Sequence, residues 1–565
     1  MASAERTADG GTAAGGAARP DGAPATVAVV GTGTMGQGIA QVALVAGHRV
    51  RLHDVAPGRA EQAAAAITER LRRMVDKGRM SAGDRDAALA RLHPATELGE
   101  LADAELVVEA VLEELGAKQL LFEALETVVG AECLLATNTS SLSVTAIAGA
   151  LRRPGRFAGM HFFNPAPLLP LVEVVSGHAT DAATADRVHA LALAWGKTPV
   201  RCTDTPGFIV NRVARPFYAE AFRLYEERAA DPATIDAVLR ESGGFRMGAF
   251  ELTDLIGQDV NEAVTHSVWE AFFHDPKFTP SLAQRRLVQA GRLGRKSGHG
   301  WYAYGDGTGG GGRPGAASGS GRVPAASPPA ASPYPAPSPA QPPRPPQPLT
   351  APPQPAPRQV RVHGSLGPAD AVPALLAEAG VSVEHVDGPA GPAGPAGPAG
   401  RGGHLDLPGG SRLLLASGHA PQPGEVHFDL ALDYRTATRT ALACADTVPE
   451  TDRAAAVGLF QALGKQVSVI APVPGLIVAR TVAMLADFAA DAVGRGVATG
   501  ADVDTAMRLG VNYPRGPLQW CCDELGPGWA VDVLRALHAA YPTGRYAPSQ
   551  ALVRCCGPTG GQSCP

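Results

Sequence analysis

The 565-residue chain has few aromatic residues, little net charge and no long apolar run. Aromatics make up 5% of the residues, and 49 basic against 54 acidic residues leave a formal net charge of −5. A chain with this balance has no electrostatic reason to bind nucleic acid or an anionic membrane. Because apolar runs of about 18 residues are absent, the sequence predicts no membrane-spanning helix.

Cysteine is also scarce, with eight residues in the whole chain. Scattered cysteines in a chain this long do not form a disulfide framework. The adjacent pairs 521–522 and 555–556 lack the spacing of zinc ligands, so we expect thiols and no metal site. Residues 1–25 are rich in Ala and Gly and lack the apolar segment of a secretory signal, which predicts a disordered tail on a cytoplasmic protein.

Glycine (67) and proline (50), in contrast, together make up about a fifth of the chain. Residues 306–358 hold 17 of the prolines and are typical of a semi-extended linker. The P-x-x-P spacing at Pro342 and Pro345 leaves open a ligand for a proline-recognition domain, which is the rarer use of such segments. A run of four G-P-A triplets at 388–400 is too short for a triple helix and predicts a loop insertion.

The front half opens with the pattern of a dinucleotide site. A short apolar strand at 26–30 is followed by G-T-G-T-M-G, then by a helix expected over 39–46 and a second strand at 49–53. Asp54 ends that strand, 18 residues after the last glycine. An acid there bonds the ribose hydroxyls and repels a 2′-phosphate, so we expect NAD rather than NADP as the cofactor. The cofactor-binding residues predicted here are Gly31, Gly33, Thr34, Met35, Gly36 and Asp54.

Strands and helices continue to alternate after this motif. Strands are expected at 105–109 and 133–137, with a helix at 117–129 between them, which predicts a parallel, doubly wound sheet. Ligands of such sheets bind beyond the carboxyl ends of the strands. That edge is where we expect Glu113, Lys118, Asn138 and Ser140.

A histidine and a glutamate lie near the ends of the next two predicted strands. His161 ends the strand 157–161, and Glu173 follows twelve residues later within the apolar strand 171–175. A carboxylate among aliphatic residues needs a partner, and an imidazole one strand away would gain basicity from it. From the pattern alone a structural histidine beside an edge-strand glutamate is favoured, because this spacing is not specific.

Seven motifs across residues 26–304 together resemble the L-3-hydroxyacyl-CoA dehydrogenases of the 3-hydroxybutyryl-CoA type. In chain order they are G-T-G-T-M-G, V-V-E-A-V-L-E, N-T-S-S-L, H-F-F-N-P, L-V-E-V-V, D-T-P-G-F-I-V-N-R and G-R-K-S-G-H-G-W-Y. The resemblance implies that His161 is the catalytic base and that Glu173 orients it. It further implies that Ser140 and Asn211 contact the reacting part of the substrate.

The same resemblance assigns residues to the cofactor and to CoA. Glu113 and Lys118 match positions on the nicotinamide side, and Asn164 and Lys77 match positions near the CoA moiety. A family position that faces CoA and is commonly serine is matched by Arg70. The implied reaction is NAD-dependent oxidation of an L-3-hydroxyacyl-CoA, such as 3-hydroxybutyryl- or 3-hydroxyadipyl-CoA, in fatty-acid or phenylacetate breakdown. The alternative is a catalytically silent dinucleotide- or acyl-CoA-binding protein on the same fold.

The back half repeats part of the front half. T-P-G-F-I-V-N-R at 205–212 recurs as V-P-G-L-I-V-A-R at 473–480, and an offset of 268 residues holds from Asp236/Asp504 to Gly248/Gly516. Asn211 corresponds to Ala479, so one active site per chain is expected. For oligomeric state, the hypotheses are a homodimer and an intramolecular pseudo-dimer formed by the two copies.

The expected fold class is α/β: a Rossmann-like domain and an all-α domain, then a degenerate Rossmann-like module and a second all-α domain. The boundaries expected are a tail at 1–25, an NAD-binding domain at 26–204 and a helical domain at 205–305. They continue with a linker at 306–358, the degenerate module at 359–472 and the second helical domain at 473–556.

Overall fold

The computed structural model describes residues 25–304, 346–386, 403–526 and 528–556. Residues 1–24 of the expected tail, residues 306–345 of the expected linker and the G-P-A loop at 388–400 lie outside the described residues. The chain divides into two compact units. The first contains the described residues up to Thr139 together with 144–172 and 177–198, and the second contains 140–143, 173–176 and the chain from Pro199 onward.

The first sheet has eight strands in the order β3-β2-β1-β4-β5-β6-β7-β8. Strand β1 pairs with β2 and β4 in parallel, and β2–β3, β4–β5 and β5–β6 are parallel as well. This arrangement confirms the doubly wound sheet that the alternating pattern predicts. The strands are β1 (Thr26–Val30), β2 (Arg49–His53), β3 (Leu92–Ala95), β4 (Leu106–Glu109), β5 (Leu134–Thr137), β6 (Phe157–Phe162), β7 (Leu171–Ser176) and β8 (Thr198–Thr203).

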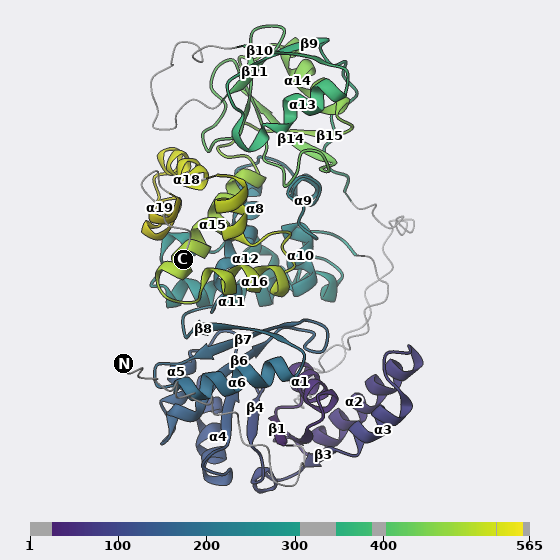
Figure 1. The fold of residues 1–565 in the computed structure, drawn as a ribbon, viewed down its shortest axis with the longest axis vertical. Coiled ribbons are helices and arrows are strands. Elements are labelled where there is room, and N and C mark those ends of the chain that lie inside the picture. The colour runs from purple at the N-terminus through teal and green to yellow at the C-terminus, as the bar shows by residue number, and fades with distance from the viewer. Residues whose placement is uncertain (1–24, 305–345, 387–402, 527, 557–565) are drawn as a thin grey trace, which may run out of the picture. The chain divides into compact units, whose positions relative to one another are not determined.

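Helices connect these strands, and α2 and α3 lie side by side as a pair (Figure 1). Helix α1 begins at Thr34, not at Ile39 as expected, because the glycines that argue against a helix interior lie here in its first turns. An early start places the N-terminal amides of α1 directly after the glycine turn. The helices are α1 (Thr34–Val45), α2 (Arg59–Asp76), α3 (Ala82–Leu89), α4 (Leu115–Val128), α5 (Val144–Ala148) and α6 (Ala182–Ala194).

The second unit contains two helical segments that share one local geometry. The first comprises α7 (Val210–Val213), α8 (Arg215–Glu226), α9 (Pro232–Glu241), α10 (Ala249–Ile256), α11 (Gln258–Ala271) and α12 (Leu282–Gln289). The second comprises α15 (Val478–Gly494), α16 (Gly500–Gly510), α17 (Pro517–Gln519), α18 (Trp529–Ala540) and α19 (Gln550–Cys556). Among the described residues no helix is both long and apolar enough to cross a bilayer.

Equivalent contacts confirm the internal duplication at the predicted offset. The Asp236 carboxylate accepts the amides of Phe250 (3.0 Å) and Glu251 (2.9 Å). In the second copy Asp504 accepts the amides of Leu518 and Gln519, both at 2.9 Å. Each pair of amides lies at the start of a helix, so a buried carboxylate fixes the same turn twice.

The turn before each copy repeats as well. Phe208 and Leu476, again 268 residues apart, both have a φ of 49°. A bulky residue with left-handed backbone is uncommon and persists only where its surroundings determine it. The shared strain shows that the two segments have kept one backbone path although their side chains differ.

The two helical segments pack on each other through α8 and α15, with reciprocal ion pairs. Arg212 of the first copy bonds Asp491 on α15 at 2.8 Å. Arg480, its counterpart, bonds Glu220 on α8 and Glu227 just after that helix, each at 2.8 Å. Because each arginine contacts the helix of the other copy, the contact has the isologous character of a two-fold interface.

Between the helical segments lies a seven-stranded sheet in the order β10-β9-β11-β12-β13-β14-β15. Its pairings β9–β11, β11–β12 and β13–β14 are antiparallel and the other three are parallel. The strands are β9 (Gln359–His363), β10 (Ser382–Val386), β11 (His404–Asp406), β12 (Arg412–Leu415), β13 (Glu425–Phe428), β14 (Arg439–Cys444) and β15 (Gln466–Ile470).

Two helices, α13 (Ala371–Glu378) and α14 (Glu450–Ala462), join this sheet in one hydrophobic core (Figure 1). Val362, Leu405 and Phe428 point into that core. Residues 346–358, the described end of the predicted linker, form no helix or strand but bond to this module, with the Ala351 amide on the Val467 carbonyl at 2.8 Å. The predicted degenerate module is therefore a folded domain with a mixed sheet.

Candidate functional site

The glycine turn after β1 is shaped partly by the chain and partly by an open space. Gly31 has a φ of +92°, and a Cβ on it would lie 2.5 Å from the Ala110 carbonyl oxygen. A Cβ on Gly36 would overlap the Gly31 carbonyl oxygen, so this glycine lets α1 approach the turn. A Cβ on Gly33 would meet nothing within 4 Å. Open space at Gly33, beside the first turn of α1 with Thr34 and Met35, fits close approach of a phosphate to backbone amides.

Asp54 follows β2 with its carboxylate fixed by three hydrogen bonds. It accepts the Thr32 amide (2.9 Å), the Thr32 hydroxyl (2.7 Å) and the Ala56 amide (3.1 Å). Partial burial acts to raise the pKa of Asp54, but the bonds from Thr32 and Ala56 outweigh it and the pKa is lowered. The carboxylate is thus ionised and oriented, as an acceptor of ribose hydroxyls must be.

Lys118 and Glu113 belong to a buried network around Glu109, the last residue of β4. The Lys118 side chain is 1% exposed, and its Nζ lies 2.5 Å from Glu109 Oε1 and 3.2 Å from Glu113 Oε2. Glu109 also accepts the hydroxyl of Thr137 at 2.7 Å. Sequence reasoning missed Glu109, although it stands in the V-V-E-A-V-L-E motif at the carboxyl end of a strand, where ligands of such sheets bind.

Asn138 and His161 lie at the ends of neighbouring strands β5 and β6. The Asn138 side-chain carbonyl accepts the Phe162 amide at 2.8 Å and so anchors the chain directly after His161. His161 itself is 5% exposed, and its ring centroid lies 4.6 Å from that of Phe163. The imidazole therefore has a restricted orientation in a largely apolar setting.

Glu173, Ser140 and Asn211 are brought together within the second unit. The Glu173 side chain is fully buried, and its Oε1 accepts the amides of Ile209 (3.0 Å) and Val210 (2.9 Å) at the start of α7. Asn211, the next residue of that helix, donates from Nδ2 to the Ser140 carbonyl at 3.4 Å. A buried anion at a helix N-terminus is stabilised by the amides and the helix dipole. Glu173 thus anchors the helix that carries Asn211.

Lys77 and Asn164 line one cavity of about 590 Å³ in the first unit. Its cationic lining residues are Arg70, Arg73, Lys77, Arg79 and Lys197, and none of its described lining residues is acidic. Val42, Leu168 and Trp195 form apolar walls. Cations with apolar walls fit an anionic, partly apolar ligand. Arg70 also bonds the Gln37 carbonyl at 2.5 Å, so its position in the lining is fixed.

The second copy retains the anchor but not the catalytic group. Asp429, just after β13, accepts the amides of Ile477 (3.0 Å), Val478 (2.8 Å) and Ala479 (3.1 Å). These are the counterparts of the amides that Glu173 binds. Ala479, in place of Asn211, is fully buried and offers no polar side-chain atom. Sequence reasoning missed Asp429, because the offset of 268 residues does not extend to this carboxylate.

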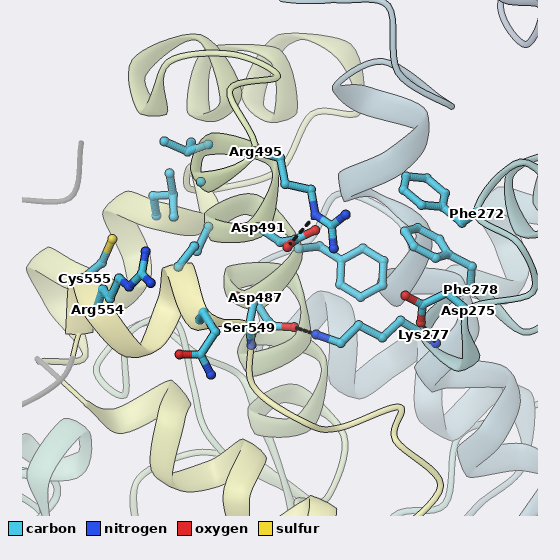
Figure 2. Close-up of a pocket in the computed structure, with 17 residues that line it drawn as sticks. Phe272, Asp275, Lys277, Phe278, Asp487, Asp491, Arg495, Ser549, Arg554 and Cys555 are labelled. Carbon is cyan, nitrogen blue, oxygen red and sulfur yellow. Dashed lines mark hydrogen bonds and ion pairs between the residues drawn. The ribbon is translucent and has the colours of Figure 1, made fainter.

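A further cavity of about 540 Å³ lies where the two helical segments meet (Figure 2). Two ion pairs line it, Lys277–Asp487 at 2.5 Å and Arg495–Asp491 at 2.9 Å. None of the predicted site residues lines this cavity. It is therefore separate from the predicted catalytic residues.

Models of three protein domains match the chain. The NAD binding domain of 3-hydroxyacyl-CoA dehydrogenase matches residues 26–205, and the C-terminal domain of the same family matches twice, at 207–304 and 475–557. A reduced Rossmann-fold domain of 3-hydroxybutyryl-CoA dehydrogenase matches residues 416–474. The double match confirms the predicted duplication, and the first match confirms NAD as the cofactor.

Individual relatives agree with these matches. The chain is 40% identical to 3-hydroxyadipyl-CoA dehydrogenase of Escherichia coli over 530 residues, 93% of this chain and 96% of that protein. It is 39% identical to the mitochondrial hydroxyacyl-coenzyme A dehydrogenase of Homo sapiens over 284 residues, 49% of this chain and 90% of that protein. A crystal structure of 3-hydroxybutyryl-CoA dehydrogenase from Escherichia coli is similar with a TM-score of 0.77 at 38% identity, covering 94% of this chain and 98% of that one.

An ordered glycine turn, an ionised acid after β2 and a carboxylate-anchored helix thus occur in a chain whose whole length matches one family. The chain belongs to the 3-hydroxyacyl-CoA dehydrogenase family, in its tandem form, and is an NAD-binding oxidoreductase.

Proposed function

We propose that the chain oxidises an L-3-hydroxyacyl-CoA at C3 with His161 as the general base and Glu173 as the residue that positions it. Family membership carries the dehydrogenase activity and NAD binding. The observation that supports these individual roles is the placement of His161. It is an almost fully buried imidazole near the carboxyl end of β6, at the edge where doubly wound sheets bind their ligands.

The reaction needs one proton acceptor and one hydride acceptor. NAD supplies the hydride acceptor, C4 of its nicotinamide ring. His161 accepts the proton of the 3-hydroxyl while C3 loses its hydride, so the alcohol becomes a ketone. Glu173 determines which ring nitrogen carries the proton and stabilises the imidazolium that forms. In the reverse direction the imidazolium returns the proton to a 3-oxoacyl-CoA.

Ser140 and Asn211 complete the proposed catalytic group. Their side chains bind the C3 oxygen and the acyl group and hold C3 in a near-attack geometry. The bond from Asn211 to the Ser140 backbone supports this role, since it ties the two residues to each other before substrate binds. Glu113, Lys118 and Asn138 form the nicotinamide side, with Lys118 held in place by Glu109.

The cationic cavity around Lys77 and Asn164 is the proposed CoA site. CoA carries phosphates at one end and an uncharged pantetheine arm, which match the cations and the apolar walls of this cavity. Arg70 adds a positive charge where serine is common in the family. This charge favours phosphate binding over a hydroxyl contact.

For the acyl group we propose 3-hydroxyadipyl-CoA or 3-hydroxybutyryl-CoA, in phenylacetate or fatty-acid breakdown. The tandem relative that matches 93% of this chain is named for the first substrate, and a solved tandem relative is named for the second. Measuring kcat/KM for 3-hydroxybutyryl-, 3-hydroxyhexanoyl- and 3-hydroxyadipyl-CoA, each with NAD and NADP, distinguishes them. A preference of tenfold or more for one substrate corresponds to about 1.4 kcal/mol of transition-state binding.

We further propose that the second copy replaces a partner subunit, so that residues 205–305 and 473–556 form an intramolecular pseudo-dimer. The reciprocal pairs of Arg212 and Arg480 support this arrangement. A chain cut within the linker near Pro342 should then lose stability or dimerise. A front half that stays monomeric, stable and fully active would contradict the pseudo-dimer.

His161→Gln tests the catalytic proposal. Loss of the general base together with misorientation should lower kcat by about three orders of magnitude or more, with NAD binding unchanged. His178→Gln, at an exposed histidine of the same unit, is the control and should keep wild-type turnover. Near-native turnover of His161→Gln would refute the assignment, and a wild-type chain that binds NAD without turnover would indicate the catalytically silent alternative.

A further inference from the structure

Three metal-ligating side chains gather on one face of the second sheet, far from the glycine turn in sequence. In the antiparallel pairing of β9 and β11, His404 lies directly opposite His363. Directly opposed residues of a sheet point to the same face, and so do residues two apart on one strand. His363, His404 and Asp406 therefore share a face, and it is the face opposite the core residues Val362 and Leu405.

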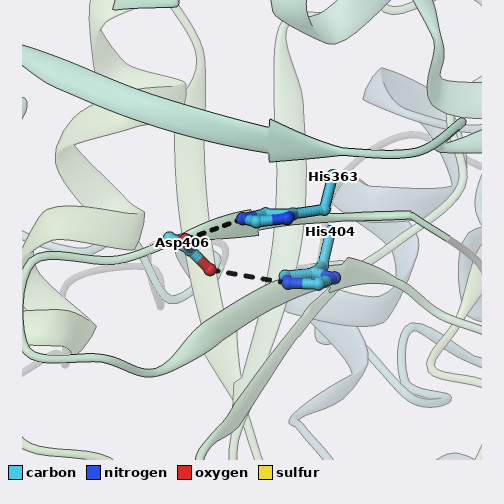
Figure 3. Close-up of side chains that lie close together, drawn as sticks. All are labelled: His363, His404 and Asp406. Carbon is cyan, nitrogen blue, oxygen red and sulfur yellow. Dashed lines mark hydrogen bonds and ion pairs between the residues drawn. The ribbon is translucent and has the colours of Figure 1, made fainter. Parts of the chain in front are cut away.

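Both imidazoles turn toward the same carboxylate (Figure 3). His363 Nε2 lies 2.8 Å from Asp406 Oδ2, and His404 Nε2 lies 3.5 Å from Asp406 Oδ1. The two rings stack with planes 6° apart and centroids 4.6 Å apart. One ligand atom from each of the three residues lies within 4.8 Å of the others.

These separations suit a bound ion. Bonds of about 2.0–2.1 Å to a tetrahedral zinc ion place two ligand atoms about 3.3–3.4 Å apart. The observed distances of 2.8 and 3.5 Å bracket that value. Small rotations of two side chains would therefore complete the geometry without moving a strand.

The neighbouring cations do not neutralise Asp406. Its cross-strand partners in the sheet are Arg361 and Arg412. Arg361 pairs with Glu384 at 3.1 Å, and Arg412 pairs with Glu425 at 2.9 Å. Each arginine is thus committed to another carboxylate. Two neutral imidazoles and one carboxylate carry a net charge of −1, which a divalent cation compensates.

A second cluster on this sheet provides a comparison. His419, Glu425 and His427 also lie within ligand distance of one another. However, the His419 ring nitrogens already contact Ser417 Oγ (3.0 Å) and the Ala420 carbonyl (3.1 Å), and Glu425 is bound by Arg412. Its groups are engaged with the protein, whereas both histidines of the first cluster face one shared carboxylate.

We propose that His363, His404 and Asp406 bind one divalent transition-metal ion of the zinc class. Two imidazoles and a carboxylate are borderline ligands that zinc, cobalt and nickel accept, and they are a poor set for calcium or magnesium. His363 is 23% and Asp406 38% exposed, so water completes the coordination. The ion joins β9 to β11 and stabilises the reduced Rossmann module. It takes no part in hydride transfer.

The sequence predicts no metal site, and the reason is clear from the sheet. His363 and His404 are 41 positions apart, and neither follows a ligand spacing of a known zinc motif. Only the antiparallel register of β9 and β11 places them opposite each other.

The test uses the full-length chain, freed of metal with a chelator and titrated with Zn²⁺ and with Co²⁺. We expect one equivalent of Zn²⁺ per chain by calorimetry and a Co²⁺ absorption spectrum typical of nitrogen and oxygen ligands. At a free Zn²⁺ concentration of 100 times Kd, the unfolding equilibrium constant of the module should fall about 100-fold. Turnover of an acyl-CoA substrate should stay within twofold.

Three single variants decide the outcome. His363→Gln and Asp406→Asn, both partly exposed, should fold and lose the equivalent of metal together with the stabilisation. His419→Gln, in the comparison cluster, should keep both. Absence of a stoichiometric site in the wild type would overturn the proposal. Unchanged binding in both His363→Gln and Asp406→Asn, or equal loss in His419→Gln, would overturn it as well.

Discussion

Glu173 and Asp429 allow the structural and catalytic contributions of one carboxylate to be separated. Both are fully buried, and both accept backbone amides at the start of the corresponding helix in their copy. Glu173 is proposed to position His161 as well, whereas the second copy carries Ala479 where the first has Asn211. The matched substitutions are Glu173→Gln and Asp429→Asn.

The structure sets the expected cost in stability. Glu173 accepts two amides through one oxygen, and the amide oxygen of glutamine can still accept both. Replacing a charged acceptor by a neutral one weakens each bond by about 1 kcal/mol, so Glu173→Gln should cost about 2 kcal/mol. Asp429 accepts amides through both oxygens, and in asparagine one of these positions becomes a donor. Asp429→Asn should therefore destabilise the chain at least as much.

Activity should separate the two variants in the opposite direction. Glu173→Gln should lower kcat by about two to four orders of magnitude, because the imidazole loses its orientation and the imidazolium its counter-charge. It should also move the acid limb of the pH–rate profile to lower pH, since a nearby carboxylate raises the pKa of an imidazole. Asp429→Asn should keep wild-type kcat.

The assay combines NADH formation at saturating acyl-CoA with urea unfolding of each variant. Rates are compared under conditions where both variants are folded. Equal kcat values in Glu173→Gln and Asp429→Asn would show that Glu173 acts only through the fold. An unchanged pH profile in Glu173→Gln would refute its action on His161.

Three further predictions concern other parts of the chain. Lys77→Ala should raise KM for the acyl-CoA about tenfold with kcat at saturation unchanged, because one phosphate contact contributes about 1–2 kcal/mol to binding; a fall in kcat alone would contradict its place in the CoA site. Asp54→Asn should raise KM for NAD at least about tenfold and lower the preference for NAD over NADP, measured as a ratio of kcat/KM values, since the charge that repels a 2′-phosphate is gone. Burial raises the pKa of Glu220, but Arg545 and Arg480 outweigh it and lower that pKa to about 2. The stability from Glu220 is therefore present above about pH 4.5 and lost as pH falls toward 2, about 3 kcal/mol in all, and Glu220→Gln should flatten this acid limb in urea titrations.

Much of the first unit could be predicted from local patterns. The strand before the glycines and the acid after β2 are recognisable because each glycine and the acid has one local task. The same holds for β6 and β7, whose apolar residues predicted the strands and whose polar residues stood out within them. The start of α1 was wrong by five residues, because glycine disfavours helices in general but is required here beside the turn.

The second sheet could be predicted much less. The strands at 381–385, 413–415 and 467–470 were expected, but β9, β11, β13 and β14 were not. These are strands of three to six residues in a mixed sheet, and so short a segment carries no clear period. Asp429 was missed for a related reason, since its function depends on which helix start it faces and not on its neighbours in sequence.

The sequence by itself determined the family, the cofactor and the duplication, because these depend on short motifs and on a constant offset within one chain. Tertiary structure alone decided which groups meet across long separations. Arg480 reaches Glu220 and Glu227 only through the packing of α15 on α8, and His363 meets His404 only through antiparallel register. Pairings of this kind are set by the burial of apolar faces on the whole sheet or helix, and no local pattern records them.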